Sequence, residues 1–175
     1  GIPWRAVIRF LITTIFMLGV LFLSAGRLQW WEGWAYTGMT LFVLVSSRAL
    51  MLLKNPDMAR ERAEAAHKKD VKAWDKTIVP LIAIYGPLIS WIVAGLDERF
   101  SWTPDLPTYV QIVALCVIVL GNMIATWAMV INRFFSSHVR IQADRGHTVV
   151  SAGPYHVVRH PGYAGGILAW IAAPV

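Results

Sequence analysis

The sequence has little charge and almost no cysteine. Only 15% of its 175 residues are charged, whereas a soluble domain averages nearer a quarter. Cys116 is the single cysteine, so an internal disulfide is impossible and cysteine usage leaves the redox compartment open. It lies within an apolar run, where we expect a small buried residue. The low charge excludes an ordinary soluble domain.

Several motifs of soluble enzymes are also missing. The chain has no P-loop, no GxSxG nucleophile turn and no dinucleotide-binding GxGxxG. It shows neither an internal repeat nor a low-complexity tract, so residues 1–175 are expected to form one membrane domain. His156 and His160 have a metal-binding spacing, but no cysteine or acidic ligand accompanies them. Because structural sites usually show four clear ligands, we expect no metal site.

Long apolar runs are what the chain does have. Hydrophobic residues make up 57% of it, and they gather in residues 6–25, 36–53, 78–96 and 109–131, each near the ~20 residues that a spanning helix needs. A fifth run begins at Tyr163. The first run resembles a signal peptide, but it is longer than a usual hydrophobic region and further spans follow. The pattern predicts an all-α polytopic membrane helical bundle with four complete transmembrane helices in residues 1–131 and the start of a fifth.

Basic residues are unequal between alternate loops. Thirteen of the sixteen lie at the N-terminus, in the 54–76 connector, or between the fourth and fifth runs, and only Arg27 and Arg99 lie in the other two loops. The positive-inside rule predicts that the N-terminus, the connector and residues 132–160 face the cytoplasm. The net charge of +6 then follows from topology and calls for no nucleic-acid partner. Asn55-Pro56-Asp57 has the pattern of a helix start, which predicts a surface helix from Met58 to Trp74.

Residues 140–166 form a polar interlude between apolar runs, and they are the place to look for function. Polar groups beside hydrocarbon are costly unless they are solvated, paired or bound. Tyr155 and Tyr163 offer flat faces for a ring or a cation, and His147 and His160 offer hydrogen-bonding groups. Exposed amides at a helix start after His160 would favour a carboxylate. Together these features suit a polar cofactor with a ring and a charged end, although interface anchoring and close helix packing remain alternative roles.

The segment also carries a long motif. Gly153-Pro154-Tyr155 followed by Arg159-His160-Pro161-Gly162-Tyr163-Ala164-Gly165 resembles the GPYxxxRHPxYxG signature of the isoprenylcysteine carboxyl methyltransferase (ICMT) family of integral membrane methyltransferases. The upstream Gln142 and the run from His147 to Val150 resemble that family too.

The resemblance implies an enzyme that transfers a methyl group from S-adenosylmethionine to a lipophilic acceptor at the cytoplasmic face of a membrane. The acceptor, a small molecule or a lipidated partner in the bilayer, would present a carboxylate, thiol or amine. No residue is assigned a catalytic role. Ten residues are implied to contact the cofactor: Gln142, His147, Thr148, Val149, Val150, Tyr155, His160, Pro161, Gly162 and Tyr163. We expect a bacterial inner membrane rather than an endoplasmic reticulum location.

The chain departs from the family at its end. Family members continue with a further helix and a cytoplasmic tail that carries a cofactor-binding glutamate and a substrate-facing arginine, so we expect residues 1–175 to be C-terminally truncated. Two alternatives stay open. Membrane sterol and lipid reductases that bind NADPH share the RHPxY part, with a bulkier residue where Gly162 stands. A non-catalytic membrane subunit could also retain the fold.

Overall fold

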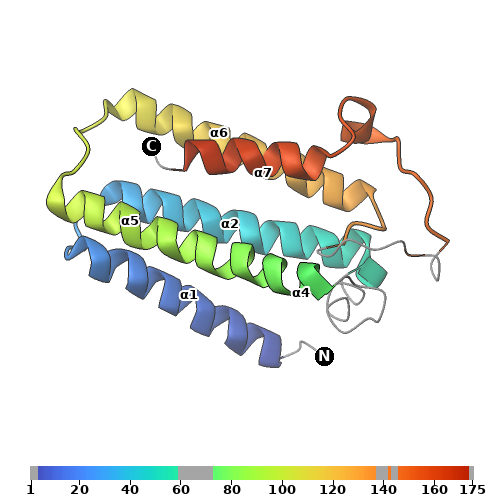
Figure 1. Cartoon of the computed structure of the whole chain (residues 1–175), viewed down its shortest axis with the longest axis horizontal. Coiled ribbons are helices and arrows are strands. Elements are labelled where there is room, and N and C mark those ends of the chain that lie inside the picture. The colour runs from blue at the N-terminus through green and yellow to red at the C-terminus, as the bar shows by residue number, and fades with distance from the viewer. Residues whose placement is uncertain (1–3, 59–72, 137–141, 143–145, 174–175) are drawn as a thin grey trace.

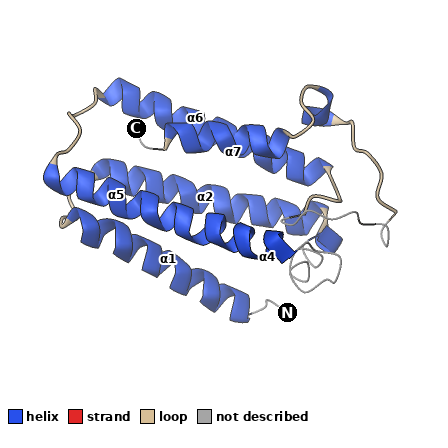
Figure 2. Ribbon diagram, in the orientation of Figure 1, coloured by secondary structure: helices blue, strands red, loops and turns tan. Residues whose placement is uncertain are grey.

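The computed structural model describes residues 4–58, 73–136, 142 and 146–173, and within these ranges it is helical with no strand (Figure 2), as the sequence predicted. The helices are α1 (Trp4–Ala25), α2 (Trp31–Lys54), α4 (Ala73–Pro80), α5 (Gly86–Phe100), α6 (Thr108–Ile131) and α7 (Pro161–Ala172). A π-helical turn, η2 (Leu81–Tyr85), joins α4 to α5, and a 3₁₀ turn, η4 (Gly153–His156), precedes α7.

Three of the described helical stretches are long and apolar enough to cross a membrane: Trp31–Lys54, Thr77–Phe100 and Thr108–Ile131. In α1 the apolar stretch Phe10–Ala25 is shorter by the same measure. The membrane character is therefore confirmed, while four complete spans and a fifth start remain a prediction. Cys116 differs from expectation, because it is exposed on α6. In a membrane helix an apolar run has no need to be buried by protein, since lipid can cover it.

The third long helical stretch is irregular at η2. Pro80 ends α4, and Gly86 and Pro87 begin α5. A proline has no backbone N–H to donate, and its ring clashes with the carbonyl of the preceding turn. Local widening into a π-helical turn is one of the recognised ways in which a helix continues past such a disruption.

Glycines set the closest helix contacts. A Cβ at Gly165 of α7 would lie 2.3 Å from the carbonyl oxygen of Gly121 on α6, and a Cβ at Gly121 would lie 2.5 Å from the Gly165 carbonyl oxygen. On the other side of the bundle, a Cβ at Gly95 of α5 would lie 2.5 Å from the Ser24 side chain of α1. Figure 1 shows α6 and α7 side by side, with α2, α5 and α1 below them.

Successive helices bring alternate loops to the same end of the bundle. The start of α1, the end of α2, the end of α6 and the start of α7 lie at the right in Figure 1, and the turns after α1 and α5 lie at the left. At the right-hand end the Asn55 side-chain amide donates a hydrogen bond of 2.5 Å to the Val130 carbonyl of α6. This grouping matches the loops that the charge pattern placed together. Which end faces the cytoplasm stays a prediction.

The predicted surface helix over 58–74 lies almost wholly outside the described residues. At its start, a helical turn begins at Pro56, as the Asn55-Pro56-Asp57 pattern predicted, and Met58 is fully buried. At its end, Trp74 belongs to α4.

Candidate functional site

The candidate site is built onto the end of α6 by Asn132. Its backbone N–H closes the last turn on the Ala128 carbonyl at 3.1 Å. Its side-chain oxygen accepts a hydrogen bond from the Phe134 N–H at 2.9 Å, and its side-chain nitrogen donates to the Tyr155 hydroxyl at 3.0 Å. Asparagine suits this position because its side chain bonds the backbone two residues ahead and so shapes a tight turn. Asn132 thus connects α6, the following turn and η4.

Tyr155 is the part of η4 that Asn132 holds. Its hydroxyl also donates a hydrogen bond of 3.4 Å to the Ala128 carbonyl. Burial raises the pKa of the Tyr155 phenol above its ordinary 10.0, and the hydrogen bond from Asn132 offsets part of this rise. The hydroxyl oxygen accepts from Asn132 and the hydroxyl proton is donated to α6. The hydroxyl of Tyr155 therefore holds η4 against the end of α6. Only the ring remains for a ligand.

The turn before Tyr155 requires a glycine at position 153. Its φ is +59°, in the left-handed region, and a Cβ there would lie 2.3 Å from Cδ1 of Ile131 on α6. A side chain would therefore meet both backbone strain and a steric clash. The following Pro154 is buried, so η4 sits directly on the end of α6.

A second anchor lies at Gln142, whose side chain is 1% exposed. The side-chain amide donates to the Phe134 carbonyl at 2.7 Å. The Gln142 N–H donates to Nδ1 of His147 at 3.2 Å, and the His147 N–H donates back to the Gln142 carbonyl at 3.2 Å. Since Nδ1 accepts, the neutral imidazole carries its proton on Nε2 (an assignment from the hydrogen bonds). The His147 ring lies 4.7 Å from the Phe134 ring.

The residues between these anchors are open to their surroundings. His147 and Thr148 are exposed, Val149 is 95% exposed, and Val150 is half-buried. Burying a valine side chain as open as this one would contribute about 1.5–3 kcal/mol. This stretch is a place where a ligand could cover apolar surface.

The start of α7 forms the opposite wall. His160 is its N-cap residue, and the His160 and Tyr163 rings lie 5.8 Å apart at an interplanar angle of 34°. Both side chains are exposed, with Tyr163 at 70%. Beneath them Pro161 is fully buried, and a Cβ at Gly162 would lie 2.8 Å from the Phe135 ring. Free backbone amides at this helix start favour an anionic group.

The predicted residues therefore fall into two groups. The side chains of Gln142, Tyr155 and Pro161, together with Gly162, belong to the packed framework. The exposed group is His147, Thr148, Val149, His160 and Tyr163. Val150 is half-buried and so intermediate between the two groups. Sequence reasoning missed the framework residues Asn132 and Phe134. An asparagine directly after an apolar helical run is a recognisable end signal and could have found the first; Phe134 had no distinguishing signal.

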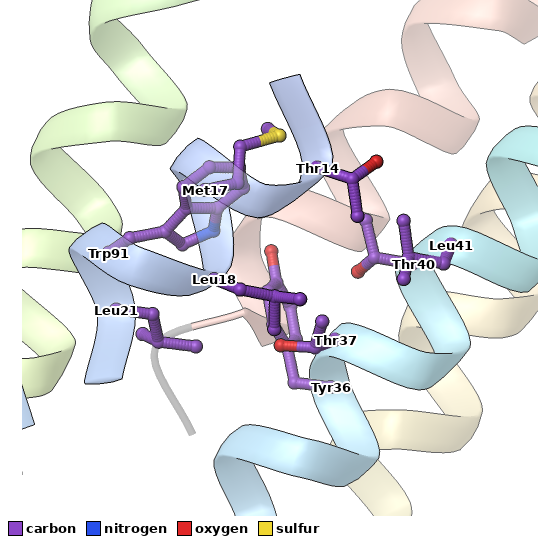
Figure 3. Close-up of a pocket in the computed structure, with 9 residues that line it drawn as sticks. All are labelled: Thr14, Met17, Leu18, Leu21, Tyr36, Thr37, Thr40, Leu41 and Trp91. Carbon is purple, nitrogen blue, oxygen red and sulfur yellow. The ribbon is translucent and has the colours of Figure 1, made fainter. Parts of the chain in front are cut away.

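A cavity in the middle of the bundle, between α1, α2 and α5 (Figure 3), has a volume of about 30 Å³, which is room for about one water. It is lined by Thr14, Met17, Leu18, Leu21, Tyr36, Thr37, Thr40, Leu41 and Trp91. Among the described residues, no group of three His, Cys, Asp or Glu is placed to hold a metal ion.

A family model matches the part of the chain that holds this site. Residues 112–175 match the model of the isoprenylcysteine carboxyl methyltransferase (ICMT) family. Two rice proteins, each named "Probable protein-S-isoprenylcysteine O-methyltransferase", from Oryza sativa subsp. indica and subsp. japonica, are 36% identical to this chain over 70 residues. That match covers 38% of this chain and 36% of each rice protein, so the chain spans about a third of the length of these curated relatives. No solved structure gives a significant match.

Proposed function

We propose that this chain, whose residues 112–175 are ICMT-like, is the membrane part of a methyltransferase that uses S-adenosylmethionine and methylates a lipophilic acceptor. One observation carries the proposal. The segment that resembles the family is also the segment that packs a polar, partly exposed loop against the end of α6, next to the start of α7. The arrangement puts groups suited to a polar cofactor beside groups exposed to lipid.

The exposed side chains fit such a cofactor. The adjacent rings of His160 and Tyr163 offer flat surfaces for an adenine ring or a sulfonium, and the free amides of the first turn of α7 suit a carboxylate. Val149 offers apolar contact from the other wall. We assign Gln142, Tyr155, Pro161 and Gly162 to the same site in a supporting role. They hold the two walls in place, and the Tyr155 ring is available for contact.

The chemistry sets modest demands on the protein. S-adenosylmethionine supplies a methyl carbon activated by its sulfonium, which an acceptor displaces in line. The residues named above would align the reactants and exclude water. A carboxylate acceptor is ionised at neutral pH and needs no general base. A thiol or amine acceptor would need one, and His147 and His160 are the candidates.

The acceptor and the orientation are part of the proposal. A lipophilic acceptor would reach the α7 start sideways from the bilayer, because apolar side chains such as Ile167 of α7 are exposed there. The positive-inside count favours a cytoplasmic site, which a cofactor made in the cytosol requires. A bacterial inner membrane remains our preferred location.

The NADPH reductase alternative fits the geometry less well. Its motif has a bulkier residue at the position of Gly162, where even a Cβ would lie 2.8 Å from the Phe135 ring. Phe135 would have to move to admit such a residue. The Gly162–Phe135 contact therefore favours the methyltransferase.

Calorimetric titration of the detergent-purified full-length protein tests the proposal. S-adenosylhomocysteine and NADPH are titrated separately into the wild type, His160→Ala and Tyr163→Ala. We expect saturable S-adenosylhomocysteine binding that weakens at least ten-fold, or about 1.4 kcal/mol, in both variants. His156→Ala is the matched control, since His156 is exposed but outside the assigned group, and it should bind as the wild type does.

Other outcomes redirect the assignment. NADPH binding in place of S-adenosylhomocysteine would move the protein to the reductases. Binding of neither by folded protein would favour the non-catalytic subunit. Equal weakening in His156→Ala would place the site elsewhere on the loop.

A further inference from the structure

A second and larger cavity lies at the end of the bundle away from the candidate site. Its volume is about 620 Å³, within the roughly 300–1,000 Å³ of typical ligand pockets. Residues of α1, α2, α5, α6 and α7, together with the turn after α5, line it. Six of the lining residues are aromatic: Trp30, Trp31, Tyr36, Trp91, Trp102 and Trp170.

The charged residues that line this cavity are all acidic. Its lining contains Glu32, Asp97, Glu98 and Asp105, and none of the described residues that line it is Lys, Arg or His. Two of these acids are paired with neighbouring residues. Glu98 forms an ion pair with Arg27. Asp97 accepts hydrogen bonds from the backbone N–H of Thr103 at 2.8 Å and from its hydroxyl.

Glu32 also has a neutral partner, but among the described residues only Oε1 of its carboxylate is hydrogen-bonded, whereas Thr103 engages both oxygens of Asp97. It is half-buried in the first turn of α2, and the Gln111 side-chain amide of α6 donates a hydrogen bond of 3.1 Å to it. The amide and the positive end of the α2 dipole stabilise the carboxylate, but neither cancels its charge. A carboxylate in a cavity that is lined with aromatic rings, and whose described lining residues include no basic group, is complementary to a cation.

We propose that this cavity binds a monovalent organic cation with an apolar body, such as an alkylammonium compound. Glu32 neutralises the charged head, tryptophan faces attract it through their ring electrons, and the apolar walls cover the body. Ala172 lines the cavity and Tyr163 belongs to the candidate site. They are nine residues apart on α7, or about 14 Å at 1.5 Å per residue. The cavity is thus a separate site, and it does not depend on the proposed methyl transfer.

Three probes with the same six-carbon chain test the charge preference. Hexyltrimethylammonium, neutral N-hexylacetamide and anionic hexanesulfonate are titrated calorimetrically into the full-length protein in a non-ionic detergent. We expect saturable binding of the ammonium compound, at least ten-fold tighter than either of the others. Equal affinity for N-hexylacetamide, or no binding of the ammonium compound, would overturn the proposal.

Paired variants test the role of Glu32. Glu32→Gln keeps the size of the side chain and a hydrogen-bonding partner for Gln111, and it should bind hexyltrimethylammonium at least five-fold more weakly. Asp57→Asn removes an exposed carboxylate at the other end of the bundle and should leave binding unchanged. Wild-type affinity in Glu32→Gln would refute the assignment. If Glu32→Gln does not fold, the comparison of the three probes with the wild type decides alone.

Discussion

Polar side chains of residues 140–166 with similar chemistry have different surroundings. Gln142 and the Tyr155 hydroxyl have left water and are hydrogen-bonded to the end of α6 and the turn after it. His160 and Tyr163 remain exposed. A buried polar group needs a partner within the protein, because leaving it unpaired costs about 1–3 kcal/mol. The sequence predicted that all these residues contact a cofactor. Only the fold shows which of them are packed into the framework and which are exposed for a ligand.

Tyr155→Phe tests the framework role. The variant loses both hydrogen bonds of the hydroxyl, so we expect the free energy of unfolding to fall by about 1–2 kcal/mol. It should weaken S-adenosylhomocysteine binding less than Tyr163→Ala does, because the ring is kept. Thermal and denaturant unfolding in detergent measure the first effect. Tyr109→Phe, at a tyrosine that is 70% exposed, is the control and should be neutral.

The raised pKa of Tyr155 adds a pH dependence. Burial favours the protonated phenol in the folded state, so its pKa there is above that of the unfolded chain. The stability it contributes is fully present below pH 10 and is lost as the pH rises through the higher folded-state pKa. We therefore expect the stability difference between wild type and Tyr155→Phe to shrink above pH 10. A constant difference up to strongly alkaline pH would contradict this.

At the scale of elements, the contact between α6 and α7 depends on two glycines that face each other. Lipid tails are as apolar as the side chains of a membrane helix, so moving those side chains from lipid to a helix contact gives no hydrophobic gain. Membrane helices therefore associate through close packing, which small residues permit. Close helix packing was one of the roles that the sequence left open for residues 140–166. The structure assigns that role to Gly165, opposite Gly121.

Gly165→Ala and Gly166→Ala form a matched pair on α7. The first places a Cβ 2.3 Å from the Gly121 carbonyl oxygen, while a Cβ at Gly166 meets nothing within 4 Å. Overpacking of this kind costs about 1–3 kcal/mol, so Gly165→Ala should unfold at a lower temperature in detergent. Gly166→Ala should be neutral or slightly more stable, since alanine favours helix. Equal unfolding temperatures of the two variants would contradict the prediction, because α6 and α7 would then move apart without loss of stability.

At the scale of the whole molecule, orientation follows from charge and not from packing. The positive-inside prediction is tested with Val149→Cys and Asp105→Cys, each made in a Cys116→Ala background and treated with a membrane-impermeant maleimide on intact cells. Val149 and Asp105 are both exposed. Val149 belongs to the segment between α6 and α7 and Asp105 to the turn after α5, and Figure 1 shows these two segments at opposite ends of the bundle. We expect labelling of Asp105→Cys in intact cells and of Val149→Cys only after permeabilisation. The reverse pattern would invert the topology.

The sequence by itself determined the helical membrane class, the approximate helix boundaries and the segment that resembles the family. Spans and loops follow from local hydrophobicity, and a motif is local by definition. The tertiary structure decided which helices touch, how Asn132 fastens the loop, and where the large cavity forms. Asn132 and Tyr155 are 23 residues apart, and Glu32 and Gln111 are 79 residues apart. Contacts of this separation arise only when helices pack, because no local pattern specifies which distant residue a side chain will meet.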